Sequence, residues 1–554
     1  MNNLKSHPRE SGNPKINPRF RGGDKDQENW IYIWCAALIV FGVFLHLYRI
    51  SANEFFFYDE GMYLNYNRNF LDLVAQNPPK NFHEAFIIVK ILTQQALGTA
   101  KALWFLVMNM RVFLGGVDMD YFPRVISSVC GLATVGVTYL LARRLFQSQR
   151  VGLMSAAFLC ILPSHVFYSR LAMQEAMSSL LFVSGIYLYL FPRGFGWRTF
   201  LSAVCLTGAF FTNYRMIIAP VFIFLIEFIF GFLSKQPIAW RKCVWFVVSF
   251  YAIIFGVGSL NNGANTFITF AWMFHQADMA KTEFDWVNFI SFPYYLFRLE
   301  NVVWGALFFA NGYWLKKKDW AKFFPAAVVL LQMFLFSFAS EKGARYLSVV
   351  LAFEAIAVAG FLGFLLERFS QQRERIFVYA LFILLTLLSG LRSYRIAGFK
   401  SDYGKDIAMV KAVDPAARFV STQPQLHALY LKNQRDISEC PHDFATLMAK
   451  YNQGYRYLIL EPQAYVSWTS DGKRFSPRLV EFLEFIREHL RPIKEFSHLD
   501  RVMLERFVFD HNENLPRSVN FLKDKNKNYG TIRIYDLRMV LDALREILGK
   551  DVKA

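Results

Sequence analysis

Cysteine is scarce in this chain, with six residues in 554. Five of them lie in or at the edge of apolar runs, and only Cys440 stands in the polar carboxyl-terminal part. The chain shows neither the spacing of a disulfide framework nor the Cys/His spacing of a metal site. The cysteines are therefore interpreted as small core residues.

Several sequence motifs are also missing. There is no glycine-rich phosphate loop of either common type, no HExxH, no GxSxG and no repeat of 20–50 residues. The sequence thus gives no support for a P-loop nucleotidase, a dinucleotide-binding domain, a zinc protease, an α/β-hydrolase or a solenoid. Acidic residues are outnumbered, 43 against 61 basic ones, which gives a net charge of +18.

Apolar residues are abundant. They make up 54% of the chain, which includes 59 phenylalanines, and the mean hydropathy is +0.24. This composition is typical of a multi-pass membrane protein. In that class the basic excess lies in cytoplasmic loops, so nucleic acid is not an expected partner.

Eleven apolar runs are predicted to cross the membrane, and residues 1–29 to form a disordered cytoplasmic tail. The runs are 30–50, 122–142, 151–169, 173–191, 199–213, 216–233, 243–260, 296–314, 321–340, 346–366 and 376–393. With a cytoplasmic amino terminus, every predicted inside loop is basic, as the positive-inside rule requires. The expected location is the plasma (inner) membrane, with a membrane domain over 30–396.

Two further apolar segments, 82–96 and 100–115, contain charged residues and are short. We interpret them as interfacial helices on the outer face, and a membrane hairpin of two spans remains the alternative. They belong to a large outer loop, 51–121. Residues 397–554 alternate short strands (417–422, 455–460, 531–535) with helices (425–433, 444–451, 478–490, 537–549). This pattern predicts a soluble α/β domain outside the cytoplasm.

The adjacent acids Asp59 and Glu60 lie eight residues beyond the first span, after three phenylalanines and a tyrosine and before a glycine. A carboxylate there could take a proton from an acceptor hydroxyl, and it could also help to hold a divalent metal. The alternative is a solvated acid at the amino terminus of a helix over 61–74.

Other charged residues are predicted on the same outer face. Arg170 and Glu175 lie in the turn after the third span, Arg124 at the mouth of the second, and Lys342 and Arg345 before the tenth. Arginine and lysine on that face suit a lipid phosphate or pyrophosphate, or ordinary phospholipid head groups. Glu175 could instead be a helix-terminal charge and Arg170 a head-group anchor. Glu227 and Glu354, inside apolar runs, are functional candidates by default, and His165 is interpreted as a core residue.

Taken together, several segments resemble one family. They are Asp59-Glu-Gly-Met-Tyr63, Phe105–Gly116, Tyr121-Phe-Pro-Arg124 with its continuation to Gly131, Leu141-Ala-Arg-Arg144, Leu162-Pro163 and Ser169-Arg-Leu-Ala, with an acid at Glu175. Their order is similar to that in the GT-C integral-membrane glycosyltransferases, in particular bacterial relatives of protein O-mannosyltransferases and of the lipid A aminoarabinose transferase.

The resemblance implies a polyprenyl-phosphate-sugar donor used on the non-cytoplasmic face and an envelope lipid, glycan or protein as acceptor. It implies Asp59 as the base that activates the acceptor. The acid between spans three and four is often Asp in relatives, so Glu175 departs from the pattern and puts a metal-ligand role for it in doubt. We expect inverting transfer, with Asp59, Glu60 and Glu175 as the catalytic residues. Arg124, Arg170, Lys342 and Arg345 are the expected donor-phosphate ligands, and Asp59 and Glu175 are candidate metal ligands. The alternatives are a lipid or sugar transporter or flippase, and a non-catalytic envelope-assembly protein.

Overall fold

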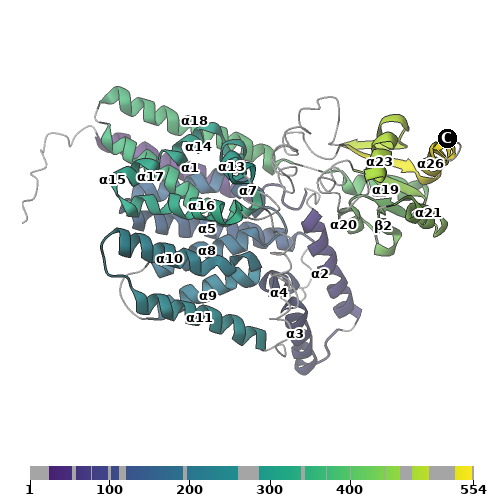
Figure 1. Ribbon diagram of the computed structural model, residues 1–554, viewed down its shortest axis with the longest axis horizontal. Helices are drawn as coiled ribbons and strands as arrows, with labels where there is room; N and C mark the ends of the chain where they lie inside the picture. The colour runs from purple at the N-terminus through teal and green to yellow at the C-terminus, as the bar shows by residue number, and fades with distance from the viewer. Residues whose placement is uncertain are drawn as a thin grey trace, which may run out of the picture.

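The computed structural model describes most of the chain. The described residues are 24–52, 58–76, 78–97, 101–110, 120–190, 196–259, 286–337, 344–369, 371–399, 401–441, 443–461, 477–497 and 531–551. Figure 1 shows a helical bundle at one side and a smaller domain with a sheet at the other. Residues 1–23 of the predicted tail, most of the loop after span seven and Lys342 lie outside the described residues, whereas residues 24–29, which were predicted to be disordered, form the first turns of a helix.

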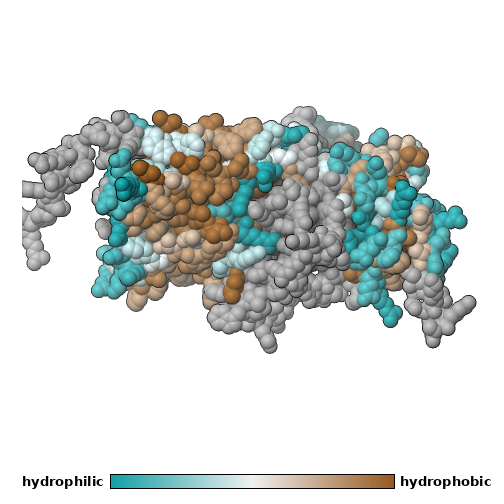
Figure 2. Space-filling model, turned by 90° about the horizontal axis from the view of Figure 1, so that it is seen from above, coloured by the Kyte–Doolittle hydropathy of each residue, from teal (hydrophilic) through white to brown (hydrophobic). Residues whose placement is uncertain are grey.

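The protein is a polytopic α-helical membrane protein. Its bundle is made of α1 (Asp24–Leu47), α5 (Phe122–Phe146), α6 (Gln149–Ile161), α7 (Pro163–Ser169), α8 (Glu175–Tyr189), α9 (Trp197–Thr212), η3 (Tyr214–Ile218), α10 (Ala219–Glu227), η4 (Phe228–Leu233), α11 (Trp240–Ser259), α13 (Trp286–Tyr295), η5 (Leu296–Glu300), α14 (Val302–Phe309), α15 (Gly312–Lys317), α16 (Trp320–Ser337), η6 (Ala344–Val350), α17 (Leu351–Arg368) and α18 (Gln372–Ala397). Figure 2 shows apolar residues over the side of this bundle and hydrophilic ones at its far end.

Every predicted span coincides with helical segments, but the count of eleven is not confirmed. Among the described residues, seven helices are long and apolar enough to cross a membrane, and an eighth is added if α6 and α7 form one span. The difference comes from short and interrupted helices. α8 and α9 have 15 and 16 residues, and run 296–314 is divided into η5, α14 and α15. How many segments cross the bilayer stays a prediction.

A proline bends the α6–α7 pair. Pro163 cannot continue the hydrogen bonding of α6, and it favours an extended conformation at the residue before it. Leu162 accordingly has φ −67° and ψ 124°, and the two helices meet at 60°. The bend carries the chain into the buried turn that precedes α8, which becomes part of the site described below.

Three helices of the first loop lie outside the bundle: α2 (Tyr58–Gln76), α3 (Phe82–Leu97) and α4 (Ala102–Asn109). Figure 1 shows α3 and α4 running across the end of the bundle rather than along it. α3 exposes Phe82, Phe86, Ile87 and Ile91. An exposed apolar face of this kind is what an interfacial helix places among lipid head groups. The interfacial interpretation stays a prediction.

The carboxyl-terminal part has a five-stranded mixed sheet of order β2-β1-β3-β5-β4. Its elements are α19 (Tyr403–Val413), β1 (Phe419–Ser421), α20 (Pro424–His427), η7 (Ala428–Tyr430), η8 (Gln434–Asp436), β2 (Ile437–Glu439), α21 (Phe444–Asn452), β3 (Tyr457–Leu460), α23 (Pro477–His489), β4 (Lys494–Ser497), β5 (Thr531–Asp536) and α26 (Leu537–Asp551). β1, β2 and β3 are parallel, whereas β5 is antiparallel to β3 and β4. The three predicted strands are confirmed; β2, β4 and α19 were not predicted.

The small domain contacts α2 directly. The Asn65 side chain donates to the Gln425 carbonyl over 2.6 Å, and Arg68 donates to the Leu429 carbonyl over 2.6 Å. Gly61 lets the two backbones approach closely, because a Cβ there would lie 2.8 Å from the Gln425 oxygen. The α20–η7 segment is thereby packed on the first turns of α2.

A buried polar network holds α20 in place. His427 bonds to Asp406 Oδ2 through Nε2 at 2.8 Å, and its Nδ1 lies 3.0 Å from Ser421 Oγ. All three side chains have 0% exposure, so the cluster supports the fold. Burial raises the pKa of Asp406. Burial opposes protonation of His427, but the neighbouring Asp406 outweighs it and raises the pKa of the imidazole.

We expect the small domain to lose stability as pH rises. A raised histidine pKa stabilises the fold fully below pH 6.5, and this contribution disappears as pH passes the folded-state pKa. The pKa of Asp406 is also raised in the folded state, so its contribution to stability likewise decreases as pH rises. Hydrogen exchange of β1 in the full-length protein, corrected for its intrinsic pH dependence, should show falling protection above pH 6.5. Asp406→Asn/His427→Gln should remove this slope, and the exposed-site control His489→Gln should keep it. A slope unchanged in the double variant would contradict the assignment.

Candidate active site at the amino terminus of α2

Glu60 forms a buried ion pair in the first turn of α2. Arg124 donates to it twice, from Nε over 2.6 Å and from Nη2 over 2.8 Å. The two side chains are 0% and 2% exposed. Arg124 is in the first turn of α5, just after Pro123, which fits that position because it needs no amide proton there. This fork-shaped pair fixes α2 against α5.

The turn before α8 contacts the same carboxylate. The Ala172 amide donates to Glu60 Oε1 over 2.9 Å. Nearby, Arg170 donates to the carbonyls of Leu45, Tyr48 and Ala397 at 2.5, 2.8 and 3.1 Å. These carbonyls lie at the ends of α1 and α18, where helices leave acceptors unpaired. Arg170 thus ties two helix ends together beside the Glu60–Arg124 pair.

Asp59 faces a different partner from its neighbour. Arg345 Nη1, at the start of η6, lies 2.5 Å from Asp59 Oδ2. The Asp59 side chain is 18% exposed to solvent, and the Arg345 side chain is 10% exposed. The pair therefore joins the first turn of α2 to the segment before α17. Of the two acids, Asp59 is the one that solvent or a substrate can reach.

Lys101 and Glu175 add charge around this pair. Lys101, just before α4, is influenced electrostatically by Asp59, Arg345, Glu175 and Arg215. Burial lowers the pKa of its amine to about 8, Asp59 opposes that change and Arg345 adds to it. Its Nζ lies 4.3 Å from the centre of the Tyr63 ring.

Arg215 is a third cation near this pair, because it also acts electrostatically on Lys101. It is at the start of η3, 4.2 Å from the centre of the Tyr346 ring, and donates to the Tyr346 hydroxyl over 3.2 Å. Because Tyr346 follows Arg345 in the chain, two guanidinium groups meet at η6. Two acids and three cations therefore gather here from α2, α4, α8, η3 and η6.

Several buried polar atoms of the cluster have no hydrogen-bond partner among the described residues. They are Glu175 Oε2, Gln174 Oε1, Arg345 Nε and the Tyr63 hydroxyl. Buried polar atoms in native proteins are nearly always paired, so such a group needs an explanation. Atoms of this kind also occur elsewhere in the described part of the bundle, so these four mark polar groups that a bound molecule could reach and do not by themselves indicate one.

The residues present do not suit a divalent metal. Within the described residues, no group of three His, Cys, Asp or Glu side chains is placed to hold a metal ion. Asp59 already pairs with Arg345, and Lys101 brings a further positive charge to both acids. This charge distribution favours an anion. We therefore assign no metal role to Asp59 or Glu175.

The structure thus brings most of the predicted residues to one end of the bundle. Asp59, Glu175 and Arg345 share one cluster, and Glu60 and Arg124 form the pair beneath it. The other two intramembrane acids lie elsewhere. Glu354 accepts a hydrogen bond from Trp304 inside the bundle, and Glu227 accepts one from Tyr189 over 2.8 Å. His165 is a buried side chain 3.2 Å from the Gly131 carbonyl, as a core residue should be.

Two cations of the cluster were not predicted. Lys101 is one of the charged residues of the apolar segment 100–115, and neither it nor Arg215 was singled out as a site residue. A signal existed for Arg215, because it lies in the predicted outer turn between spans five and six, where the positive-inside rule makes a cation unusual. For Lys101 the sequence offers no comparable signal, since its neighbours are distant in the chain.

Known structures share this fold. The chain is similar to the Archaeoglobus fulgidus oligosaccharyltransferase in its apo form, with TM-score 0.54, 9% identity, 83% of this chain and 73% of that chain covered. It is also similar to ArnT from Cupriavidus metallidurans, apo (TM-score 0.52) and bound to undecaprenyl phosphate (0.51), at 12% identity over 80% of this chain and 95% of that chain. No family model and no curated protein matches the sequence. The chain therefore shares the fold of these two structures, an oligosaccharyltransferase and ArnT.

Proposed function

We propose that the protein is a glycosyltransferase that moves a sugar from a polyprenyl-phosphate donor to an envelope acceptor. The observation that carries this proposal is the cluster around Asp59, in which an accessible carboxylate adjoins three cations. Sugar transfer from a phosphate needs both a base and positive charge. The GT-C fold supports it, because ArnT of the same fold binds undecaprenyl phosphate.

In this proposal Asp59 is the general base. It accepts the proton of the acceptor hydroxyl, whose oxygen attacks the anomeric carbon of the donor sugar. The bond between that carbon and the phosphate oxygen breaks, and its electron pair leaves with the polyprenyl phosphate. One base and one direct displacement suffice, so we expect inversion. Glu175, 1% exposed, is too buried to act as a second nucleophile and instead balances the cations.

Arg345 connects the base to the leaving group. One of its outer nitrogens donates to Asp59, while its Nε is buried without a partner among the described residues. A guanidinium presents several donors in a rigid plane, so a single side chain can bind a carboxylate and a phosphate oxygen together. Lys101 and Arg215 supply further charge for the phosphate. Glu60 and Arg124 act by holding the first turn of α2 in position. Lys342, three residues before Arg345, stays a candidate ligand.

The reaction is assigned to the outer face of the membrane. Arg124 and Arg143 lie near opposite ends of α5, roughly 28 Å apart at 1.5 Å per residue. The Asp59 cluster is at the Arg124 end, and the basic loops that should face the cytoplasm are at the other. The α/β domain packs on α2 and so belongs to the outer side. Membrane lipids and a glycan, lipid or protein acceptor are the partners of this site.

Transfer should fall as pH rises through about 8, the pKa of Lys101. Above that pH the amine loses its proton and its charge, so at pH 9 roughly a tenth remains protonated. Lys101→Arg should move the fall to higher pH, because arginine stays charged. The matched control Lys90→Arg, at an exposed position of α3, should keep the wild-type profile. A wild-type profile in Lys101→Arg would contradict the role of Lys101.

The acceptor can be found by comparing a deletion strain with its parent. Mass spectrometry of envelope lipids, glycans and glycoproteins should show one sugar modification lost in the deletion strain and regained with the wild-type gene. Unchanged envelopes together with accumulation of a transported solute would support a transporter instead.

A further inference from the structure

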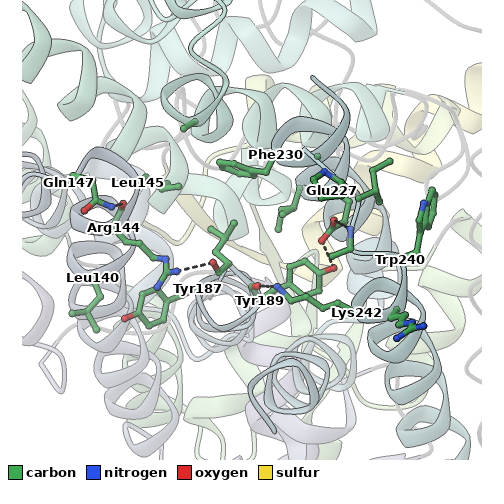
Figure 3. Close-up of a pocket in the computed structure, with 18 of the residues that line it drawn as sticks. Leu140, Arg144, Leu145, Gln147, Tyr187, Tyr189, Glu227, Phe230, Trp240 and Lys242 are labelled. Carbon is green, nitrogen blue, oxygen red and sulfur yellow. Dashed lines mark hydrogen bonds between the residues drawn. The ribbon is translucent and has the colours of Figure 1, made fainter. Parts of the chain in front are cut away.

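A second site lies at the end of the bundle opposite Asp59. A cavity of about 1220 Å³ opens there between α5, α8, the α10–η4 segment and the start of α11. Figure 3 shows Arg144 and Tyr187 on one side of it and Tyr189, Glu227 and Lys242 on the other. Its position in the fold separates it from the proposed transferase site, which involves none of these residues.

The lining of this cavity is rich in positive charge. Four cations contribute to it, Arg143, Arg144, Arg241 and Lys242, against one acid, Glu227. That acid is held by the protein itself. It accepts a hydrogen bond from the Tyr189 hydroxyl over 2.8 Å and one from the Ala239 amide over 2.9 Å. The cavity therefore presents a cationic surface to a ligand.

Two of the cations are positioned by the end of α8. Arg144 donates to the Leu190 carbonyl over 3.0 Å, and Lys242 donates to the preceding carbonyl, that of Tyr189. Cations at a helix carboxyl terminus are stabilised by its dipole and its unpaired carbonyls. This capping gives Arg144 and Lys242 a structural role. Arg143 and Arg241 have no such role, because they are exposed at the rim of the cavity and form no hydrogen bond or ion pair with a described residue.

The wall around Glu227 is built from a specific turn. The helix switches to a π-helical turn at η4, immediately after Glu227. The chain then folds back, with the Gln236 amide donating to the Gly231 carbonyl over 2.8 Å. A side chain at Gly231 would come within 2.9 Å of Ile238. π-Helical turns are frequent at functional sites, and this one shapes the cavity.

The rest of the lining is apolar and reaches the surface of the bundle. Leu140, Ile226, Phe230 and Trp240 contribute to it, and Trp240 is 60% exposed. A small soluble anion makes no favourable contact with an apolar surface, whereas a phospholipid can place its acyl chains against it. Basic pockets between membrane helices on the cytoplasmic side bind acidic lipid head groups. The geometry points to a binding site for the phosphate head group of an anionic phospholipid in the leaflet opposite the transferase site.

Native mass spectrometry of the full-length protein in detergent tests this site. Phosphatidylglycerol should bind and phosphatidylcholine should bind at least tenfold more weakly. Arg143→Ala/Arg241→Ala should weaken phosphatidylglycerol binding by roughly 25-fold, about fivefold for each charge. The matched control Lys316→Ala/Arg373→Ala removes the same charge from exposed positions outside the cavity and should bind like the wild type.

Hydrogen exchange locates the bound lipid. Phosphatidylglycerol should protect the amides of the turn over 235–239 in the wild type and not in Arg143→Ala/Arg241→Ala. Equal binding of the two lipids, or an equal loss in both double variants, would overturn the proposal. The same protection by inorganic phosphate alone would overturn the assignment to a lipid. Each of these readouts is independent of sugar transfer, so it does not depend on the proposed function.

Discussion

Asp59→Asn should reduce sugar transfer from polyprenyl-phosphate donors in membranes by about 10²–10⁴-fold, the usual contribution of a general base. The amide has nearly the shape of the carboxylate but cannot accept the acceptor's proton. Because Asp59 keeps 18% of its exposure at the edge of the cluster, the protein should still fold and reach the membrane. The measurement is the transfer rate at equal amounts of membrane-inserted protein.

The same helix supplies a control for this substitution. Asp72 is an exposed acid of α2, several turns from the cluster, and Asp72→Asn should transfer at the wild-type rate. Asp59→Glu keeps the carboxylate and should retain more activity than Asp59→Asn. If Asp59→Asn transfers sugar as fast as Asp72→Asn, Asp59 is not the base.

Glu60→Gln should destabilise the protein by about 3–5 kcal/mol, the effect of breaking a buried ion pair from one side. The substitution leaves the Arg124 guanidinium, which is 2% exposed, without the carboxylate that takes two of its hydrogen bonds. It also weakens the bond from the Ala172 amide. The expected result is a lower thermal midpoint in detergent and less protein in the membrane.

A double variant separates pairing from other effects. Glu60→Leu/Arg124→Leu removes both charges together and should be more stable than either single substitution, because no unpaired charge stays buried. The half-buried surface pair Lys322 and Asp319 gives a comparison, since breaking that pair should change stability by less than about 1 kcal/mol. Additive effects of the two substitutions would mean that Glu60 and Arg124 do not act as a pair.

The sequence allowed much of this site to be predicted, because its signals were local. Asp59 and Glu60 lie eight residues beyond an apolar span, and an acidic pair just outside a membrane helix is conspicuous without any knowledge of contacts. Arg124 and Arg345 were found because cations are unusual on the outer face. Apolar runs likewise located the helices of the bundle, since hydrophobic length is the dominant physical constraint in a membrane.

The rest depended on contacts between distant segments. The roles of Glu60 and Asp59 differ only because one faces Arg124 and the other Arg345, from helices far apart in the chain. Lys101 reaches the cluster through the packing of α4. Strands β2 and β4 are as short as the predicted strands β1 and β3, but their sequences, Ile-Ser-Glu and Lys-Glu-Phe-Ser, contain no apolar run that would indicate a strand. The number of membrane spans could not be predicted from the sequence where helices are short, or are broken as at Pro163.

The most direct test of the account is the release of polyprenyl phosphate by the purified full-length protein. The protein would be mixed with a polyprenyl-phosphate sugar and an envelope extract that contains acceptors. Wild type and Asp72→Asn should release polyprenyl phosphate only when the extract is present. Asp59→Asn should release it about 10²–10⁴-fold more slowly. Equal release by Asp59→Asn and wild type would contradict the assignment of the transferase site to Asp59.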